Sequence, residues 1–93
     1  HVSMATFAAR RLLDMAGNSS AVVAIELLGA AQGVDLHAPL QTSEKLGEVL
    51  AMIRCEVAHY DEDRYFAPDI AAARAWVENA AFTRWLPAER LYA

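Results

Sequence analysis

The sequence between residues 21 and 32 is apolar on nearly every side of the helix that it predicts. Within it, the run from Ala21 to Ala31 contains a single charged residue, Glu26. A helix that is hydrophobic all round is normally buried on all sides. A chain of 93 residues makes one small domain, which is too small to surround a helix completely. We therefore expect its cover to come from an oligomer or from a larger polypeptide.

Helical spacing recurs along the rest of the chain, and no strand-like alternation persists. We predict helices over about 2–16, 21–32, 44–59 and 68–81. Gly17 and Asn18 mark the end of the first helix, because both residues tolerate the left-handed turn that terminates helices. Ser19 or Ser20 would then cap the second helix, and Pro68 is allowed in the first turn of the last one. The fold class is therefore all-α, in a single domain over residues 1–93.

The clearest amphipathic pattern lies in the third predicted helix. This helix follows the predicted loop 34–43, which ends in a Thr42/Ser43 cap. Its apolar face is formed by Leu46, Val49, Leu50, Ile53 and Val57, spaced i, i+3, i+4, i+7 and i+11. The first helix presents a stripe of Met4, Ala8, Leu12 and Met15, and the last a face of Ile70, Ala73, Val77 and Ala80, with Trp76 to one side. These faces are the predicted core.

Charge and composition exclude several classes of partner. The net charge is −4 and no cluster of Lys and Arg occurs, so we expect no nucleic-acid partner. The apolar run at 21–31 is too short to span a bilayer, and no leader peptide precedes it, so we expect no membrane partner. The single Cys55 cannot form an internal disulfide, which favours a cytoplasmic location. His1 opens directly on a helical pattern without a cap, as in a segment cut from a longer protein.

One pair of residues has the spacing of metal ligands. Cys55 and His59 are four residues apart, so on a continuous helix they would share a face. A closed metal site needs more nitrogen or sulfur ligands than this chain offers. A histidine at the end of a helix is also stabilised by the negative end of the helix dipole. We therefore predict no metal site.

The stretch EVAHYDEDRYFAPDI at residues 56–70 gathers the most charge. Asp61 and Asp63 resemble the start of a calcium loop, but Phe66 stands where that loop needs its turn glycine. Paired carboxylates also perform acid–base chemistry. Because Arg64 lies among them, we interpret the cluster as a salt-bridged connector between two helices. The sequence contains no glycine-rich phosphate loop, nucleophile elbow or zinc signature.

Three stretches, taken in order, resemble the C-terminal portion of bacterial histidine ammonia-lyases, within the aromatic amino acid lyase family. They are HVSM at 1–4, GVDLHAPLQTS at 33–43 and EVAHYDEDRYFAPDI at 56–70, and LPA follows at 86–88. The residues that resemble the histidine branch most specifically are Arg54, Val57, Ala58, His59, Tyr60, Asp61, Asp63, Arg64 and 66–70. The resemblance covers essentially the whole chain. It implies antiparallel helices that form the C-terminal part of a larger helical lyase subunit.

The resemblance also implies a function for the larger protein, which is the non-oxidative deamination of L-histidine to trans-urocanate and ammonia. Such lyases are mostly homotetramers and use a methylidene-imidazolone electrophile formed from an internal Ala-Ser-Gly triplet. In the family, HVSM directly follows a Gln-Glu-Asp whose Glu lies in the active site. This sequence contains neither the triplet nor that Glu. We therefore assign no catalytic, cofactor-binding or metal residue, and expect that the electrophile does not form within this chain.

On this reading the chain alone is inactive, and it contributes structure and oligomer contacts to the whole enzyme. Two other readings stay open. The full protein could be a related lyase or aminomutase that acts on another amino acid, because the substrate-binding residues lie outside this sequence. The chain could also be a stand-alone helical interaction module. The residues that precede His1 would distinguish these readings.

Overall fold

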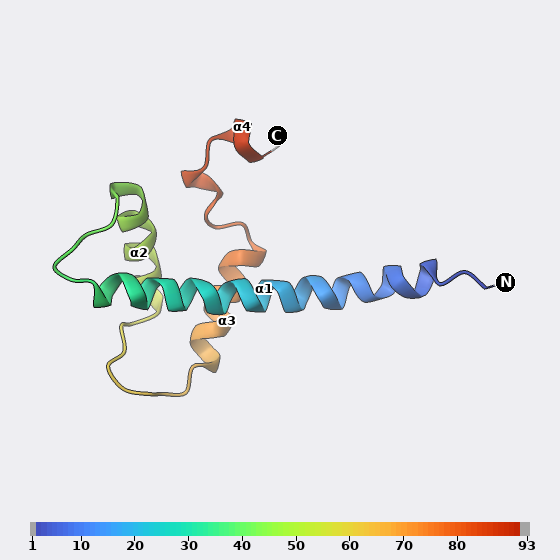
Figure 1. Ribbon diagram of the computed structural model, residues 1–93, viewed down its shortest axis with the longest axis horizontal. Helices are drawn as coiled ribbons and strands as arrows, with labels where there is room; N and C mark the ends of the chain where they lie inside the picture. Colours follow the sequence, from blue (N-terminus) through green and yellow to red (C-terminus); the bar gives the residue numbers. More distant parts are fainter. Residues whose placement is uncertain (1, 92–93) are drawn as a thin grey trace.

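The computed structural model describes residues 2–91, which form four α-helices and one 3-10 turn (Figure 1). In chain order these are α1 (Ala5–Leu36), α2 (Glu44–Glu56), α3 (Ala67–Glu78), η1 (Thr83–Trp85) and α4 (Ala88–Leu91). The described residues contain no strand, which confirms the all-α fold class. The molecule measures 63 × 38 × 19 Å because α1 extends far beyond the elements that pack on it (Figure 1).

The predicted break between the first two helices is wrong, because α1 runs without interruption through Gly17 and Asn18. No glycine in the described residues has a positive φ, so Gly17 keeps helical backbone geometry. The hydroxyl of Ser20 donates to the carbonyl of Ala16 at 3.1 Å, as serine does inside a helix, and does not cap a new one. A glycine permits the left-handed turn but does not enforce it. The helix also continues through Leu36, past the predicted end at residue 32.

Helix α2 begins at the predicted residue and ends three residues earlier than predicted. The Ser43 side chain accepts from the backbone N–H of Leu46 at 3.4 Å and caps the first turn. At the other end, Val57 turns to extended backbone, with φ −116° and ψ 105°. Arg54 in the last turn donates to the carbonyl of Val57 at 3.0 Å, which satisfies a carbonyl that the helix no longer uses.

Helix α3 also ends early, at Glu78, where residues up to 81 were predicted to be helical. Ala80 has a φ of 53°, in the left-handed region that normally favours glycine. The N–H of Ala81 donates to the carbonyl of Trp76 at 2.9 Å, and the N–H of Ala80 donates to that of Val77 at 3.2 Å. This pair of bonds is the Schellman motif, so an alanine fills the position where sequence reasoning looks for a glycine stop.

The core lies where α2 and α3 pack against the C-terminal half of α1. Its buried apolar residues are Ala24, Ala31, Ile53, Val57, Ala73 and Trp76. Ile53, which is 2% exposed, Val57 and Ala73 confirm three predicted core positions, whereas Ala80, also predicted to face the core, is exposed. Leu46 was predicted to belong to the same face as Ile53, but it is 58% exposed. The indole N–H of Trp85 donates to Glu48 at 2.7 Å and ties η1 to α2.

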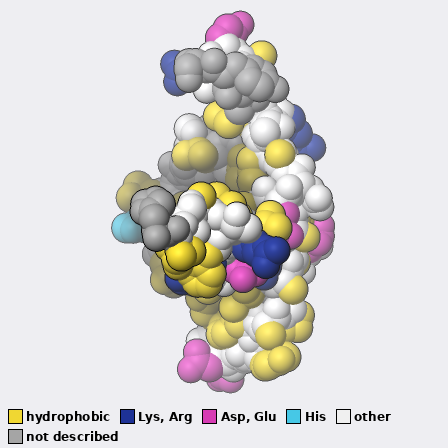
Figure 2. Space-filling model, turned by 90° about the vertical axis from the view of Figure 1, so that its right-hand side faces the viewer, with side chains coloured by type: hydrophobic (Ala, Val, Ile, Leu, Met, Phe, Trp, Pro, Cys, Tyr) yellow, Lys and Arg dark blue, Asp and Glu magenta, His cyan; other side chains and the backbone are white. Residues whose placement is uncertain are grey.

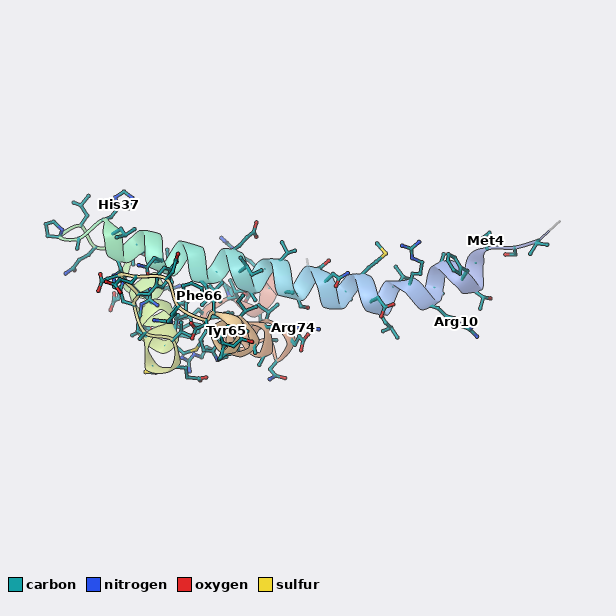
Figure 3. All side chains as sticks on the ribbon, turned by 90° about the horizontal axis from the view of Figure 1, so that it is seen from below. Met4, Arg10, His37, Tyr65, Phe66 and Arg74 are labelled. Carbon is teal, nitrogen blue, oxygen red and sulfur yellow. The ribbon has the colours of Figure 1, made fainter. Side chains whose placement is uncertain are left out.

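In the N-terminal half of α1, every residue from Ala5 to Ala16 is exposed in the described chain. Arg10 lies on this half and Met4 just before it, whereas Tyr65 and Phe66 lie beneath the other half and Arg74 lies near the middle of the helix (Figure 3). The predicted stripe of Met4, Ala8, Leu12 and Met15 is exposed, and so are Val22 and Ile25 of the predicted all-apolar segment. Figure 2, which looks toward the N-terminal end of α1, shows hydrophobic side chains on the surface of the molecule at that end. The described chain therefore does not supply the cover that the sequence demands.

By length and composition alone, α1 is apolar enough to cross a membrane. We expected no membrane span because the apolar run at 21–31 is short, but the continuous helix that contains it has 32 residues. The core helix of a soluble protein meets the same criterion, so this property carries little weight.

Candidate functional site

The candidate site is the 57–66 turn, which joins α2 to α3, together with the helix residues that it contacts. Arg64 organises this turn. Its Nε and Nη2 donate to Asp69 Oδ2 at 3.1 and 2.9 Å, and Nη2 also donates to the carbonyl of Ala58 at 3.0 Å. The guanidinium lies over the rings of Tyr60 and Phe66, 5.5 Å from each centroid. The two rings meet edge to face at 4.8 Å.

This arrangement matches the interpretation of the charged stretch as a salt-bridged connector, with one difference in the partners of Arg64. Of the nearby carboxylates, only Asp69 pairs with Arg64 in the described structure, and the backbone carbonyls of Ala58 and His59 accept its other hydrogen bonds. Asp61 and Asp63 are exposed. A fork of donors that reaches both a carboxylate and a carbonyl fixes a turn better than a single charge pair does.

A second polar cluster ties the same turn to the end of α1. Asp35 Oδ2 lies 2.8 Å from Arg54 Nε and 2.7 Å from Arg54 Nη2, and the Nδ1 atom of His59 is 3.2 Å from the same oxygen. The side-chain amide of Gln32, which is buried, donates to the carbonyl of Tyr60 at 2.7 Å. The cluster therefore joins α1, α2 and the 57–66 turn through side chains from all three.

The charge state of Asp35 follows from these contacts. Desolvation alone would raise the pKa of this carboxyl group. Hydrogen bonds from Arg54 and His59, and the positive charges of these groups, outweigh that effect and hold the pKa of Asp35 below its ordinary value. Asp35 is therefore an anion at neutral pH, as a partner of a guanidinium should be.

A cavity of about 240 Å³ lies beside the turn, between α1 and the start of α3. Its walls are mainly apolar, and they are formed by Ile25, Leu28, Gly29, Arg54, Val57, Tyr60, Arg64, Phe66, Asp69 and Ile70. The two arginines that border it are already paired with Asp35 and Asp69. Among the described residues, the lining includes no serine, threonine or cysteine that could act as a nucleophile. The cavity can hold an apolar group, but its residues do not form a reactive centre.

The pair considered as metal ligands is not brought together. Helix α2 ends at Glu56, so Cys55 and His59 do not share a helical face, and Cys55 is exposed. His59 instead lies between Asp35 and Asp61, with one carboxylate at each ring nitrogen. Within residues 2–91 the structure groups no three His, Cys, Asp or Glu side chains that could hold one metal ion.

Sequence reasoning missed Gln32 and Asp35 as members of this cluster. Asp35 was assigned to a loop, and its partners Arg54 and His59 are 19 and 24 residues away in the chain. No periodicity links residues at such separations. The only available signal was that Asp35 and Arg54 both fall within the stretches that carry the family resemblance.

Comparison with known proteins gives a consistent result along the chain. A family model described as "Aromatic amino acid lyase" matches residues 1–55, which is more than half of the 93 residues. A histidine ammonia-lyase of Aromatoleum aromaticum is 59% identical over 87 residues, covering 94% of this chain and 16% of the relative. Histidine ammonia-lyases of Burkholderia cenocepacia and Burkholderia ambifaria are also 59% identical over 87 residues, with 17% of each relative covered.

The chain thus spans about a sixth of the length of the curated relatives that it matches. An aligned length of 87 residues also extends past residue 55, into the 57–66 turn and α3. The match therefore includes both polar clusters as well as the long helix. On these findings, this chain belongs to the aromatic amino acid lyase family, which is a family of enzymes.

Proposed function

We propose that this chain forms part of a histidine ammonia-lyase, which deaminates L-histidine to trans-urocanate and ammonia without oxidation. The observation that carries the proposal is the 59% identity to histidine ammonia-lyases over 94% of the chain. The aligned region extends through the 57–66 turn, where the sequence most specifically resembles the histidine-specific lyases. Location in the cytoplasm is part of the same proposal.

Within that enzyme, the role of this segment is structural. The methylidene-imidazolone of the family forms from an Ala-Ser-Gly triplet, and the sequence contains none, so the residues present do not fit that group. When present elsewhere in such an enzyme, the electrophile activates the substrate for loss of ammonia. The residues of this chain bury a core and brace one turn with Arg64 and Asp35.

The exposed apolar half of α1 supports a further part of the proposal, which is that the segment takes part in a homo-oligomer. Large side chains on it, such as Phe7, Leu12 and Leu13, are more than half exposed in the described chain. Exposed apolar patches of this kind drive association. The 93-residue chain should therefore scatter light as a species larger than a monomer at high concentration. A sharp monomer peak would contradict this part of the proposal.

The activity is tested by an ultraviolet assay for urocanate with L-histidine. We expect steady production by the full-length protein and none by the 93-residue chain, because the family's electrophile cannot form from this sequence. Production by the short chain would overturn the structural role. A full-length protein that ignores L-histidine but releases ammonia from L-tyrosine or L-phenylalanine would support a related lyase instead. Inactivity on all three, with association intact, would favour an interaction module.

A further inference from the structure

His59 lies at a point where its protonation changes which neighbours it can bind. Its Nδ1 atom is 3.2 Å from Asp35 Oδ2 on α1. Its Nε2 atom has two neighbours of opposite character, namely the amide nitrogen of Gln32 at 3.4 Å and Asp61 Oδ1 at 3.3 Å. The first neighbour is a hydrogen-bond donor, and the second is an acceptor.

A neutral imidazole has one N–H and one acceptor nitrogen. With the proton on Nδ1, the ring donates to Asp35 and Nε2 accepts from Gln32, whose other amide proton goes to the carbonyl of Tyr60. In that state Asp61 has no proton to accept from the ring. When the ring takes up a second proton, both nitrogens become donors. Nε2 then donates to Asp61 and can no longer accept from Gln32.

We propose that His59 is a proton-controlled clasp, which in its protonated form joins the carboxylates of Asp35 on α1 and Asp61 on the 57–66 turn. The neutral ring holds α1 through Asp35 and Gln32 only. The protonated ring keeps its bond to Asp35 and exchanges the bond from Gln32 for a charged link to Asp61. Because Val57, Tyr60, Arg64 and Phe66 of the same turn line the cavity, the clasp tightens one cavity wall as the pH falls.

Charged groups from every neighbouring element face the ring or its backbone. The carboxylates of Asp35 from α1 and Asp61 from the turn lie at the two ring nitrogens. Arg54 from α2 shares Asp35 Oδ2 with the ring. Arg64 donates to the His59 carbonyl at 3.5 Å, but Asp69 of α3 neutralises its charge. The link to Asp61 is weak at each instant, because that side chain is 93% exposed and solvent screens the pair.

Hydrogen–deuterium exchange of the peptide that covers residues 57–66 tests the clasp in the full-length protein. The rates at pH 6 and pH 8 are corrected for intrinsic exchange. Imidazole groups titrate across this interval, so we expect roughly three-fold more protection at pH 6, as befits one exposed ion pair. Equal protection at the two pH values in the unsubstituted protein would overturn the proposal.

Three variants assign the effect to its atoms. His59→Gln keeps a polar side chain but cannot take up a proton, so the three-fold ratio should fall to about one. Asp61→Asn leaves the ring in place and changes an exposed residue, so folding is unaffected, and it should abolish the ratio as well. His37→Gln, at the exposed C-terminal cap of α1, is the control and should retain it. If His59→Gln or Asp61→Asn retains the full ratio, or if His37→Gln removes it, the clasp is refuted.

Discussion

The two halves of α1 differ in their surroundings more than in their composition, since residues 5–20 contain eight apolar side chains and residues 21–36 contain eleven. The C-terminal half contributes Ala24 and Ala31 to the core and holds the 57–66 turn through Gln32 and Asp35. The N-terminal half exposes Phe7, Leu12 and Met15, and no residue from Ala5 to Ala16 is buried in the described chain (Figure 3). One continuous helix thus joins a packed region to an uncovered one.

The difference shows that helix continuity and helix burial have separate causes. The uncovered half is helical because Ala, Leu, Met and Arg have high helix propensity, and because a helix already nucleated extends at little further cost. The packed half has small residues at the positions that face α3, which allows the two helices to approach closely. Each half contains four alanines, so it is the placement of Ala24 and Ala31 in the core, and not the number of small residues, that distinguishes the packed half.

The sharpest test compares a core residue of the packed region with an apolar residue of the uncovered half. Ile53→Ala should lower the free energy of unfolding of the 93-residue chain by about 2–5 kcal/mol, because the side chain is buried and leaves a cavity. Leu12→Ala, at a position that is 61% exposed, should change it by less than about 0.5 kcal/mol. Urea unfolding followed by circular dichroism measures both. Similar losses at the two sites would mean that both halves are packed.

Asp35→Asn tests the polar link between α1 and the turn. At pH 7 we expect a loss of about 1–2 kcal/mol, because the ion pair with Arg54 and the bond from His59 are weakened. The pKa of Asp35 is lower in the folded than in the unfolded state, so its contribution is present above the unfolded value of about 3.9 and is lost as the pH falls below it. Thermal unfolding of the two proteins at pH 7, 5, 4 and 3 measures the difference. A difference that grows below pH 4 would have the wrong sign for this pairing.

Arg64→Ala tests the turn itself, against Arg10→Ala on the uncovered half. Arg64 holds Asp69 and the Ala58 carbonyl, so its removal should cost about 1 kcal/mol. Arg10 is an exposed helix residue, and its removal should change stability by less than about 0.5 kcal/mol. In the full-length enzyme, Arg64→Ala should lower the melting temperature or the yield of oligomer more than the turnover per folded site. Lost turnover with stability and assembly unchanged would assign Arg64 a chemical role.

Local patterns in the sequence predicted the parts of the fold that depend on local physics. The Ser43 cap, the start of α2 and the burial of Ile53 all follow from spacing and capping. The end of α3 did not follow, because alanine rather than glycine occupies the left-handed position at residue 80. The cluster around Asp35 could not be predicted either, since its members become neighbours only after α2 folds back on α1. The role of Arg64 as a turn organiser was predicted, but its use of backbone carbonyls was not.

Gly17 marks the boundary between the two halves and gives the smallest expected effect. A Cβ at this position would lie 3.2 Å from Arg74 Nη2, the end of a flexible side chain on α3. At Gly29 a Cβ would meet nothing within 4 Å. Alanine is favoured over glycine inside a helix by about 0.8–1 kcal/mol, so Gly29→Ala should recover most of that gain. Gly17→Ala should gain less, about 0.5 kcal/mol, because Arg74 must move by a few tenths of an ångström. Thermal unfolding of both variants measures the difference between the two gains.

Equal gains would mean that α3 does not constrain α1 at residue 17, and the boundary would then lie further along the helix. A net loss at Gly17 would instead mean that Arg74 is held firmly, and that the packed region begins at this residue.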